Sequence, residues 1–157
     1  TTTVGHPSPS PEPLILYRNG GTSYINKSEV PKGYDWIPIW KLYISKAYGA
    51  GEIFPHQILG VPLIGEPNSC CSETYIVIGP FKDKQTTENV KRYIATRFFR
   101  FMVFLKKITQ DATSRVYELV PMQDFSKAWT DAELYAKYGL TDEEIAFIES
   151  MVKPMEV

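Results

Sequence analysis

Short runs of alternating apolar and polar residues fill much of the first half of the chain. They have the two-residue period of half-buried β-strands, and glycines or prolines separate most of them. The first two runs flank Asn19-Gly20-Gly21, a sequence typical of a hairpin turn. The pattern predicts a hairpin followed by further short strands. The predicted strands of this part are residues 14–18, 22–26, 37–45, 57–59 and 63–64.

The run at residues 37–45 shows the clearest alternation of these. From residue 40 onward, apolar side chains stand at every second position. They are expected to face a core, because alternate side chains of a strand point to opposite faces of its sheet. The other face is expected to be polar and to carry Lys41, Tyr43 and Ser45.

Two more strands are predicted near the middle of the chain. Residues 72–78 are rich in β-branched and aromatic side chains, and Gly79-Pro80 is expected to end this strand. Residues 116–120 form another short β-type run, and Pro121 is expected to end it.

The period of the apolar residues changes after residue 86. Residues 87–108 contain neither glycine nor proline, and the segment opens with Thr86-Thr87-Glu88, which is expected to cap a helix. Apolar side chains recur there at helical spacing, which predicts one central helix of about 20 residues. Its apolar stripe is Val90, Ile94, Phe98, Phe101, Leu105 and Ile108.

The last part of the chain predicts a helical pair. Thr130 and Thr141 are each followed three residues later by a glutamate, which is the spacing of a reciprocal capping box. Gly139 lies between them and is expected to stop the first helix. The predicted fold is therefore α+β: short mixed or antiparallel strands packed on one long central helix, with a C-terminal helical pair.

The composition is that of one folded domain. The 157 residues are 43% hydrophobic and 13% aromatic, enough to bury a core without a metal or disulfide. Residues 1–13 are rich in proline and are expected to be a linker at the cut end of a longer protein, leading into a domain at residues 14–157. Adjacent Cys70 and Cys71 are expected to be reduced thiols, since neighbours form a disulfide only with strain. No signal peptide or membrane-spanning run is visible, so we expect a cytoplasmic location away from membranes.

The net charge of −1 hides two oppositely charged parts. Residues 1–122 hold 14 basic and 10 acidic residues, whereas the acidic helical extension at residues 123–157 holds 3 and 8. One side of the predicted central helix is basic, which is typical of a phosphate-binding surface or of lysines and arginines paired within the protein. That side carries Arg92, Thr96, Phe99, Arg100, Val103 and Lys107, while Arg97, near the apolar stripe, is expected to be paired in the interior.

Catalytic and metal-binding motifs are missing from the sequence. A phosphate-binding Gly-Lys-Ser or Gly-Lys-Thr, a Gly-x-Ser-x-Gly and a His-Glu-x-x-His are all absent. The glycines at residues 49–51 lead into Pro55 rather than into a helix that would receive a cofactor phosphate. We therefore expect no catalytic residue, no metal and no cofactor in this chain.

Four segments carry a resemblance to a known family. They are residues 41–49 (KLYISKAYG), 66–75 (EPNSCCSETY), 93–101 (YIATRFFRF) and 120–141. Together they resemble the C-terminal region of bacterial restriction-modification adenine-N6 DNA methyltransferases, including fused enzymes that carry both methylase and endonuclease. The resemblance spans about residues 13–153, and the Thr-Arg-Phe-Phe-Arg-Phe block is among its most specific parts.

The resemblance implies a target-recognition domain that grips duplex DNA and reads its sequence. The family's cofactor loop and its Asn-Pro-Pro-Tyr or Asp-Pro-Pro-Tyr motif are absent, so S-adenosylmethionine would bind a methyltransferase domain of the same parent chain. A rival hypothesis is a docking module, in which the acidic helical pair or the basic helix side orients the methylase or endonuclease part.

The candidate DNA-contacting residues combine basic, amide and hydroxyl side chains at predicted turns and strand ends. Basic groups would contact phosphates, and amide or guanidinium groups would contact base edges. For each residue, a structural role in a turn or an ordinary charge exposed to solvent is an equally good interpretation. The candidates are Arg18, Asn19, Lys41, Lys46, Tyr48, Asn68, Ser69, Arg100 and Lys107.

Overall fold

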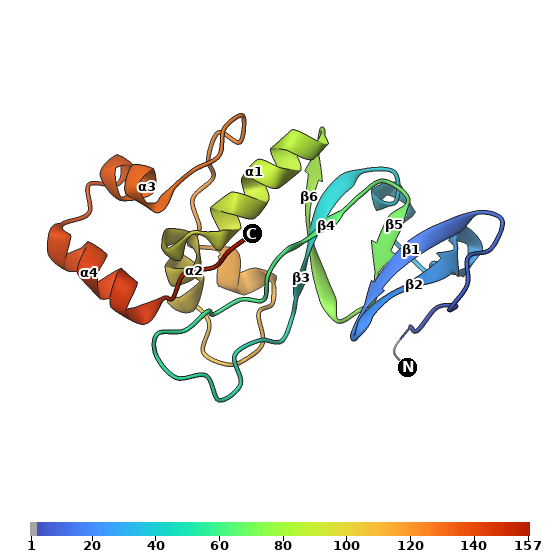
Figure 1. Cartoon of the computed structure of the whole chain (residues 1–157), viewed down its shortest axis with the longest axis horizontal. Helices are drawn as coiled ribbons and strands as arrows, with labels where there is room; N and C mark the ends of the chain where they lie inside the picture. Colours follow the sequence, from blue (N-terminus) through green and yellow to red (C-terminus); the bar gives the residue numbers. More distant parts are fainter. Residues whose placement is uncertain (1–2) are drawn as a thin grey trace.

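Two small sheets and four helices form the structure, a computed structural model that describes residues 3–157. The N-terminal sheet lies at one end of an elongated molecule, the helices lie at the other end, and the second sheet lies between them (Figure 1). The predicted α+β class is confirmed, with two three-stranded sheets. Among the described residues, no helix is both long and apolar enough to cross a bilayer.

The N-terminal sheet has the strand order β2-β1-β5. Strands β1 (Pro13–Arg18) and β2 (Gly21–Asn26) form the predicted hairpin. Gly20 in its turn has a φ of 83°, a left-handed conformation that glycine adopts without strain. Strand β5 (Ser69–Cys71) pairs with β1 in parallel, so both strands end on the same side of the sheet.

The second sheet has the order β4-β3-β6 and is antiparallel throughout. Its central strand β3 (Trp40–Ser45) is flanked by β4 (Leu63–Gly65) and β6 (Tyr75–Phe81). Strand β6 continues through Gly79-Pro80, which was expected to end it. Proline is tolerated there because β6 is an edge strand and needs no hydrogen-bond donor on its outer side.

Strand β3 is buried on both faces, so the predicted polar face is wrong. Leu42 and Ile44 pack in the helix-side core, whereas Lys41 and Tyr43 are also almost fully buried. The reason is that Lys41 and Tyr43 lie on the side of the N-terminal sheet, and Tyr43 contacts Tyr17 of β1 at 5.0 Å between ring centroids. A second layer covers the face that a single sheet would leave to solvent.

The predicted central helix is two helices. Helix α1 (Lys84–Ala95) ends at Thr96, and α2 (Arg97–Phe104) begins directly after it. Thr96 has an extended ψ of 150° and serves as the last cap of α1 and the first cap of α2. The chain turns there, as the change of direction between the two helices shows in Figure 1.

Side-chain hydrogen bonds hold the break at Thr96 in place. The Thr96 hydroxyl donates to the carbonyl of Tyr93 and accepts from the amide of Phe99. The carboxylate of Asp131, distant in sequence, accepts from the amides of Arg97 and Phe98 at 3.1 and 2.9 Å. These bonds satisfy donors that the first turn of α2 would otherwise leave unpaired.

Arg100 lies under the break and is fully buried. Its guanidinium donates to the carbonyls of Ala95, Thr96 and Gln57 at 3.0, 3.2 and 3.0 Å. Two of these carbonyls belong to the C-terminal end of α1, where the helix dipole favours a positive charge. Burial lowers the pKa of Arg100 to about 10, while the Asp131 carboxylate acts in the opposite direction, so the side chain stays protonated at neutral pH.

The break also changes which residues of this region face the core. The predicted stripe is correct as far as Phe101, which is half-buried against the core, but Leu105 and Ile108 are exposed because α2 ends at Phe104. On the side predicted to be basic, Phe99, Arg100 and Val103 are buried instead. Arg92 of that side is exposed on α1.

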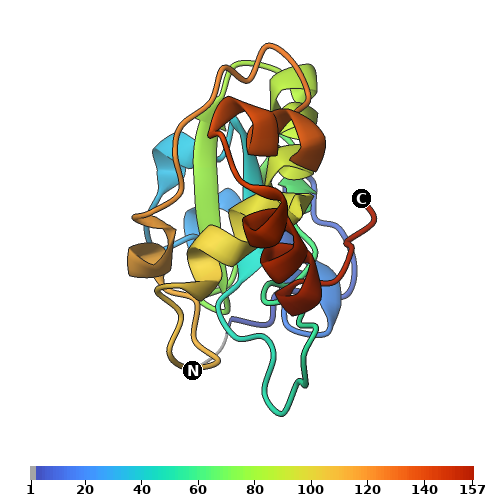
Figure 2. The ribbon, with the colours of Figure 1, turned by 90° about the vertical axis from the view of Figure 1, so that its left-hand side faces the viewer.

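The C-terminal helical pair is confirmed. Helices α3 (Asp131–Lys137) and α4 (Asp142–Met151) both begin with the predicted reciprocal capping boxes at Thr130 and Thr141. Gly139, between them, has a φ of 63° and follows the end of α3. The pair packs against α2 at the helical end of the molecule, which faces the viewer in Figure 2.

Two predicted strands are wrong. Residues 116–120 lie partly in a 3-10 helix, Ser114–Tyr117, and form no strand. Residues 57–59 form no strand either, and Ile58 has a φ of 73°. Further short 3-10 helices span Lys27–Glu29 and Tyr34–Trp36.

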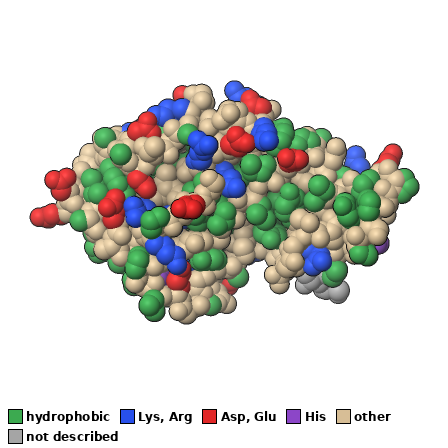
Figure 3. All heavy atoms as spheres, viewed as in Figure 1, with side chains coloured by type: hydrophobic (Ala, Val, Ile, Leu, Met, Phe, Trp, Pro, Cys, Tyr) green, Lys and Arg blue, Asp and Glu red, His purple; other side chains and the backbone are tan. Residues whose placement is uncertain are grey.

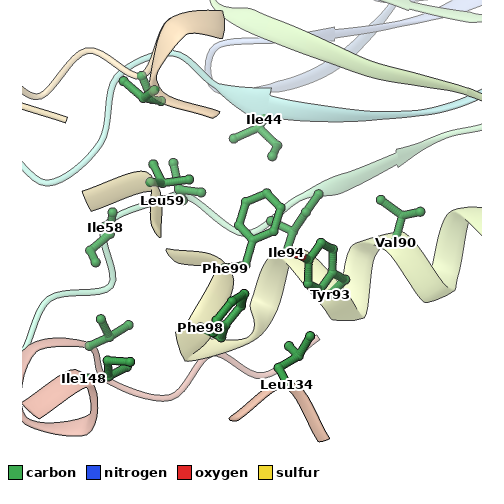
Figure 4. Close-up of a cluster of buried hydrophobic side chains, with 14 of the residues drawn as sticks. Ile44, Ile58, Leu59, Val90, Tyr93, Ile94, Phe98, Phe99, Leu134 and Ile148 are labelled. Carbon is green, nitrogen blue, oxygen red and sulfur yellow. The ribbon is translucent and has the colours of Figure 1, made fainter. Parts of the chain in front are cut away.

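One large core joins the second sheet, the loops and all four helices. Figure 4 shows Phe98 and Phe99 of α2 among Ile44 of β3, Leu134 of α3 and Ile148 of α4. A smaller core lies under the N-terminal sheet and contains Leu14, Leu16, Ile25, Val30 and Ile37.

The segment predicted as a linker is in contact with the N-terminal sheet. His6 exchanges backbone hydrogen bonds with Tyr24 of β2, and the Ser23 hydroxyl donates to the carbonyl of Val4 at 2.7 Å. The His6 ring lies 3.0 Å from the Glu29 carboxylate. The described part of this segment therefore runs alongside β2.

Arg97 is paired, as predicted, although it is only half-buried. Its Nε donates to the Val152 carbonyl at 3.0 Å, and its Nη1 lies 3.7 Å from the Glu149 carboxylate.

Candidate nucleic-acid interface

The parallel pairing of β1 and β5 brings two turns to one end of the N-terminal sheet. One is the hairpin turn after β1, and the other is the turn from β5 into β6. The Ser72 amide donates to the Tyr17 carbonyl at 2.8 Å, and the Tyr75 hydroxyl donates to the Arg18 carbonyl at 3.5 Å. Asn19 at the tip is exposed, and the half-buried Arg18 donates from Nη1 to the Asn19 carbonyl.

Lys46 directly follows β3 and lies at the same end of the sheets as the hairpin turn. The Lys46 amide donates to the Thr74 carbonyl at 3.0 Å, which ties it to the turn between β5 and β6. The Lys46 carbonyl accepts from the amide of Ala112. Its side chain is exposed, and Glu73 is an exposed acidic neighbour in the same turn. Arg18 and Asn19 from the hairpin and Lys46 from the segment after β3 thus lie at the same end of the two sheets.

Tyr48 and Lys107 lie at the base of a long loop that leaves β3 at this end. The Lys107 ammonium donates to the carbonyls of Tyr48 and Ile58 at 2.6 and 2.9 Å. It therefore joins the two ends of the loop, which projects from the lower edge of the molecule in Figure 1. Burial lowers the pKa of Lys107, although the carboxylates of Glu52 and Asp111 oppose this effect. The structure gives Lys107 a loop-clamping role.

Lys41 is a buried structural group, which corrects the expectation of a surface lysine. It is 1% exposed, and its ammonium donates to the carbonyls of Ile37, Ile39 and Glu66 at 3.2, 2.9 and 3.3 Å. Three donors thus meet three acceptors, so none is left for a phosphate. Burial lowers the pKa of Lys41 to about 8.

Asn68 and Ser69 lie away from the other candidates, near the start of β1. The exposed Asn68 has a φ of 64° and hydrogen-bonds through its backbone to Ile37 and Ile15. Ser69 is buried, donates to the Glu66 carbonyl and lies 3.0 Å from the Tyr43 hydroxyl. Ser69 is therefore out of reach of a macromolecule, and Asn68 is at the opposite end of β1 from Arg18.

Arg100 cannot hold a phosphate in this structure, because its guanidinium is buried and occupied by the three carbonyls described above. The expectation depended on an exposed helix side. The break at Thr96 turns that side inward.

A cavity of about 460 Å³ between the two sheets was not predicted from the sequence. Lys41, Tyr43, Cys70 and Cys71 are among its lining residues. Both cysteines are free, as predicted, and burial raises the pKa of Cys71 to about 12, which keeps the thiol protonated. Alternation in β3 gave no hint of the cavity, because only the packing of a second sheet encloses Lys41 and Tyr43. The described residues include no group of three metal-ligating side chains.

No protein-family model, curated protein or solved structure matches the chain.

The buried Lys41 leads to a pH-dependent prediction. Between pH 8 and about 10.4, Lys41 is largely protonated in the unfolded chain but largely deprotonated in the folded protein. The contribution of Lys41 to the free energy of unfolding therefore rises with pH across this range. Urea unfolding of the wild type and Lys41→Met at several pH values measures this contribution. The wild-type value minus the variant value should rise by about 2 kcal/mol across the window. If the difference between the two free energies of unfolding did not change with pH, the claim that burial lowers the pKa of Lys41 would be wrong.

The loop clamp of Lys107 is testable by hydrogen exchange. Lys107→Met removes two charge-assisted hydrogen bonds, so backbone amides at residues 48–58 should exchange about tenfold faster. Lys106→Met is the matched control, because that lysine is exposed and pairs only with Glu118. Equal exchange in the two variants would show that Lys107 does not hold the loop.

Proposed function

We propose that this chain is the DNA sequence-recognition domain of a restriction-modification adenine-specific DNA methyltransferase. The resemblance of its sequence to that C-terminal region motivates the proposal. The observation that carries it is the convergence of Arg18, Asn19 and Lys46 at the same end of the two sheets, through hydrogen bonds between three segments.

The shape of this end suits a DNA groove. The major groove admits a two-stranded β-ribbon, and the β1–β2 hairpin, which β5 flanks on the β1 side, brings Asn19 to an exposed tip. An asparagine side-chain amide can donate a hydrogen bond to N7 of adenine and accept one from its N6 amino group. Arg18 and Lys46 carry the positive charge that phosphates attract. In this proposal the hairpin enters the groove, and Lys46 contacts the adjacent backbone.

Methyl transfer is assigned to a different part of the parent protein. S-adenosylmethionine and the catalytic motif would belong to its methyltransferase domain, and this chain would position the duplex for that domain. The contribution of this chain to the reaction is therefore binding and orientation.

Salt-dependent DNA binding tests the proposal. Binding of the chain to a mixed-sequence duplex is measured by fluorescence anisotropy between about 50 and 200 mM salt. Each lost phosphate contact makes the negative slope of log K against log salt less steep by about 0.9. The slope of the Arg18→Ala/Lys46→Ala double variant should therefore be less steep by up to about 1.8, and the variant should bind DNA more than about tenfold more weakly.

The control is the double variant Lys27→Ala/Lys84→Ala, which removes the same charge from exposed sites outside this end of the molecule. Its affinity should fall less than about threefold. Equal losses in the two double variants would refute a localised interface, as would an unchanged affinity in Arg18→Ala/Lys46→Ala. Thermal unfolding of each variant verifies that its fold is retained.

A further inference from the structure

An apolar groove lies on the helical end of the molecule. It has a volume of about 680 Å³ and opens between α2, α4 and the segment at residues 119–121. In Figure 2, α4 and the orange segment after the 3-10 helix Ser114–Tyr117 lie on either side of α2. Phe98 and Ile148, both buried, belong to its lining.

Aromatic contacts fix the walls of this groove. Phe98 stacks on Tyr138 with ring centroids 5.1 Å apart, and Phe101 meets Phe147 edge-on at 6.0 Å. The Tyr138 hydroxyl accepts a hydrogen bond from the Gln123 amide at 2.8 Å. The groove is therefore formed before any partner arrives, which lowers the cost of binding.

Large apolar side chains along the groove remain in contact with solvent. Phe147 is 55% exposed, Leu119 is 42% exposed and Tyr138 is 40% exposed. Single exposed apolar residues are ordinary, but a continuous apolar groove indicates an interaction site.

The charge around the groove selects the kind of partner. Both charged residues that line it, Glu143 and Glu144, are acidic, and Asp142 precedes them in the same turn of α4. The nearby Lys137 bonds to Gln123 and lies over the ring of Trp129, and Lys106 is paired with Glu118. Carboxylates flank apolar side chains at the α4 end of the molecule in Figure 3.

We propose that this groove binds an amphipathic helix of a partner protein, with aliphatic side chains on one face and lysines or arginines beside them. The aliphatic side chains would pack on the exposed faces of Leu119, Tyr138 and Phe147, in the manner of a helix in a hydrophobic groove. The basic side chains would pair with Glu143 and Glu144. This interaction is separate from DNA recognition, since the groove lies on the helices and the hairpin tip lies on the N-terminal sheet (Figure 1).

Two synthetic peptides test the proposal. Both are helical, about 16 residues long, and carry leucines at the spacing of three and four residues that a groove recognises. One has lysines at the flanking positions, and the other has glutamates. Fluorescence anisotropy should show that the lysine peptide binds the 157-residue chain at least about tenfold more tightly than the glutamate peptide.

Surface variants locate the binding site. Phe147→Ala should weaken binding of the lysine peptide at least about tenfold, because it removes a central aromatic anchor. Glu143→Lys should weaken it about threefold or more. The matched controls are Ile53→Ala, a truncation at another exposed apolar residue, and Glu156→Lys, the same charge change near the C-terminus. Neither control should change the affinity.

Three outcomes would overturn the proposal. Equal binding of the two peptides would show that the acidic rim selects nothing, and full binding by Phe147→Ala would place the peptide elsewhere. Self-association of the chain in sedimentation that Phe147→Ala abolishes would identify a second copy as the occupant. The Arg18→Ala/Lys46→Ala variant should bind the lysine peptide normally, so a failure of the DNA proposal stays distinguishable from a failure of this one.

Discussion

The buried guanidinium of Arg100 joins the end of α1 to the long loop after β3, which lies 43 residues away in sequence at Gln57. It donates to carbonyls at the end of α1 and to the carbonyl of Gln57 in the long loop, all within the protein interior. A buried cation is costly, and the hydrogen bonds to three carbonyls offset that cost. The interruption between α1 and α2 supplies one of those acceptors, because in a continuous helix the Ala95 carbonyl would accept from the Phe99 amide, which here donates to the Thr96 hydroxyl. Arg100 and the break at Thr96 therefore depend on each other.

The break places the apolar groove and helps to hold the loop beside Lys46. Because α2 departs from the direction of α1, its first turn meets the Asp131 carboxylate, which fixes the start of α3 and with it the C-terminal pair. The groove between α2 and α4 follows from that placement. On the other side, the hydrogen bond to Gln57 and the Lys107 clamp hold the loop that leaves β3 beside Lys46. The hairpin tip reaches the same end independently, through the parallel pairing of β1 with β5.

Features that depend on neighbours in sequence were predictable. The β1–β2 hairpin followed from Asn19-Gly20-Gly21, and the starts of α3 and α4 followed from threonine–glutamate capping boxes. The break at Thr96 was not predictable from composition, because neither glycine nor proline marks it and its partners lie at Asp131 and Gln57. Burial of Lys41 arose from a second sheet packing over β3, which no alternation within residues 37–45 reveals. Of the candidate site, Arg18, Asn19 and Lys46 were brought together, whereas Lys41, Ser69 and Arg100 were turned inward by long-range packing.

The central claim is that the Arg100 guanidinium holds this architecture, and the free energy of unfolding of Arg100→Met in urea tests it most directly. Methionine fills part of the space but leaves the Ala95 carbonyl without a donor and removes one donor each from the carbonyls of Thr96 and Gln57, so the variant should lose about 3 kcal/mol. Arg92→Met, at an exposed position of α1, is the matched control and should change stability by less than about 0.5 kcal/mol. A loss for Arg100→Met no larger than that of the control would contradict the account.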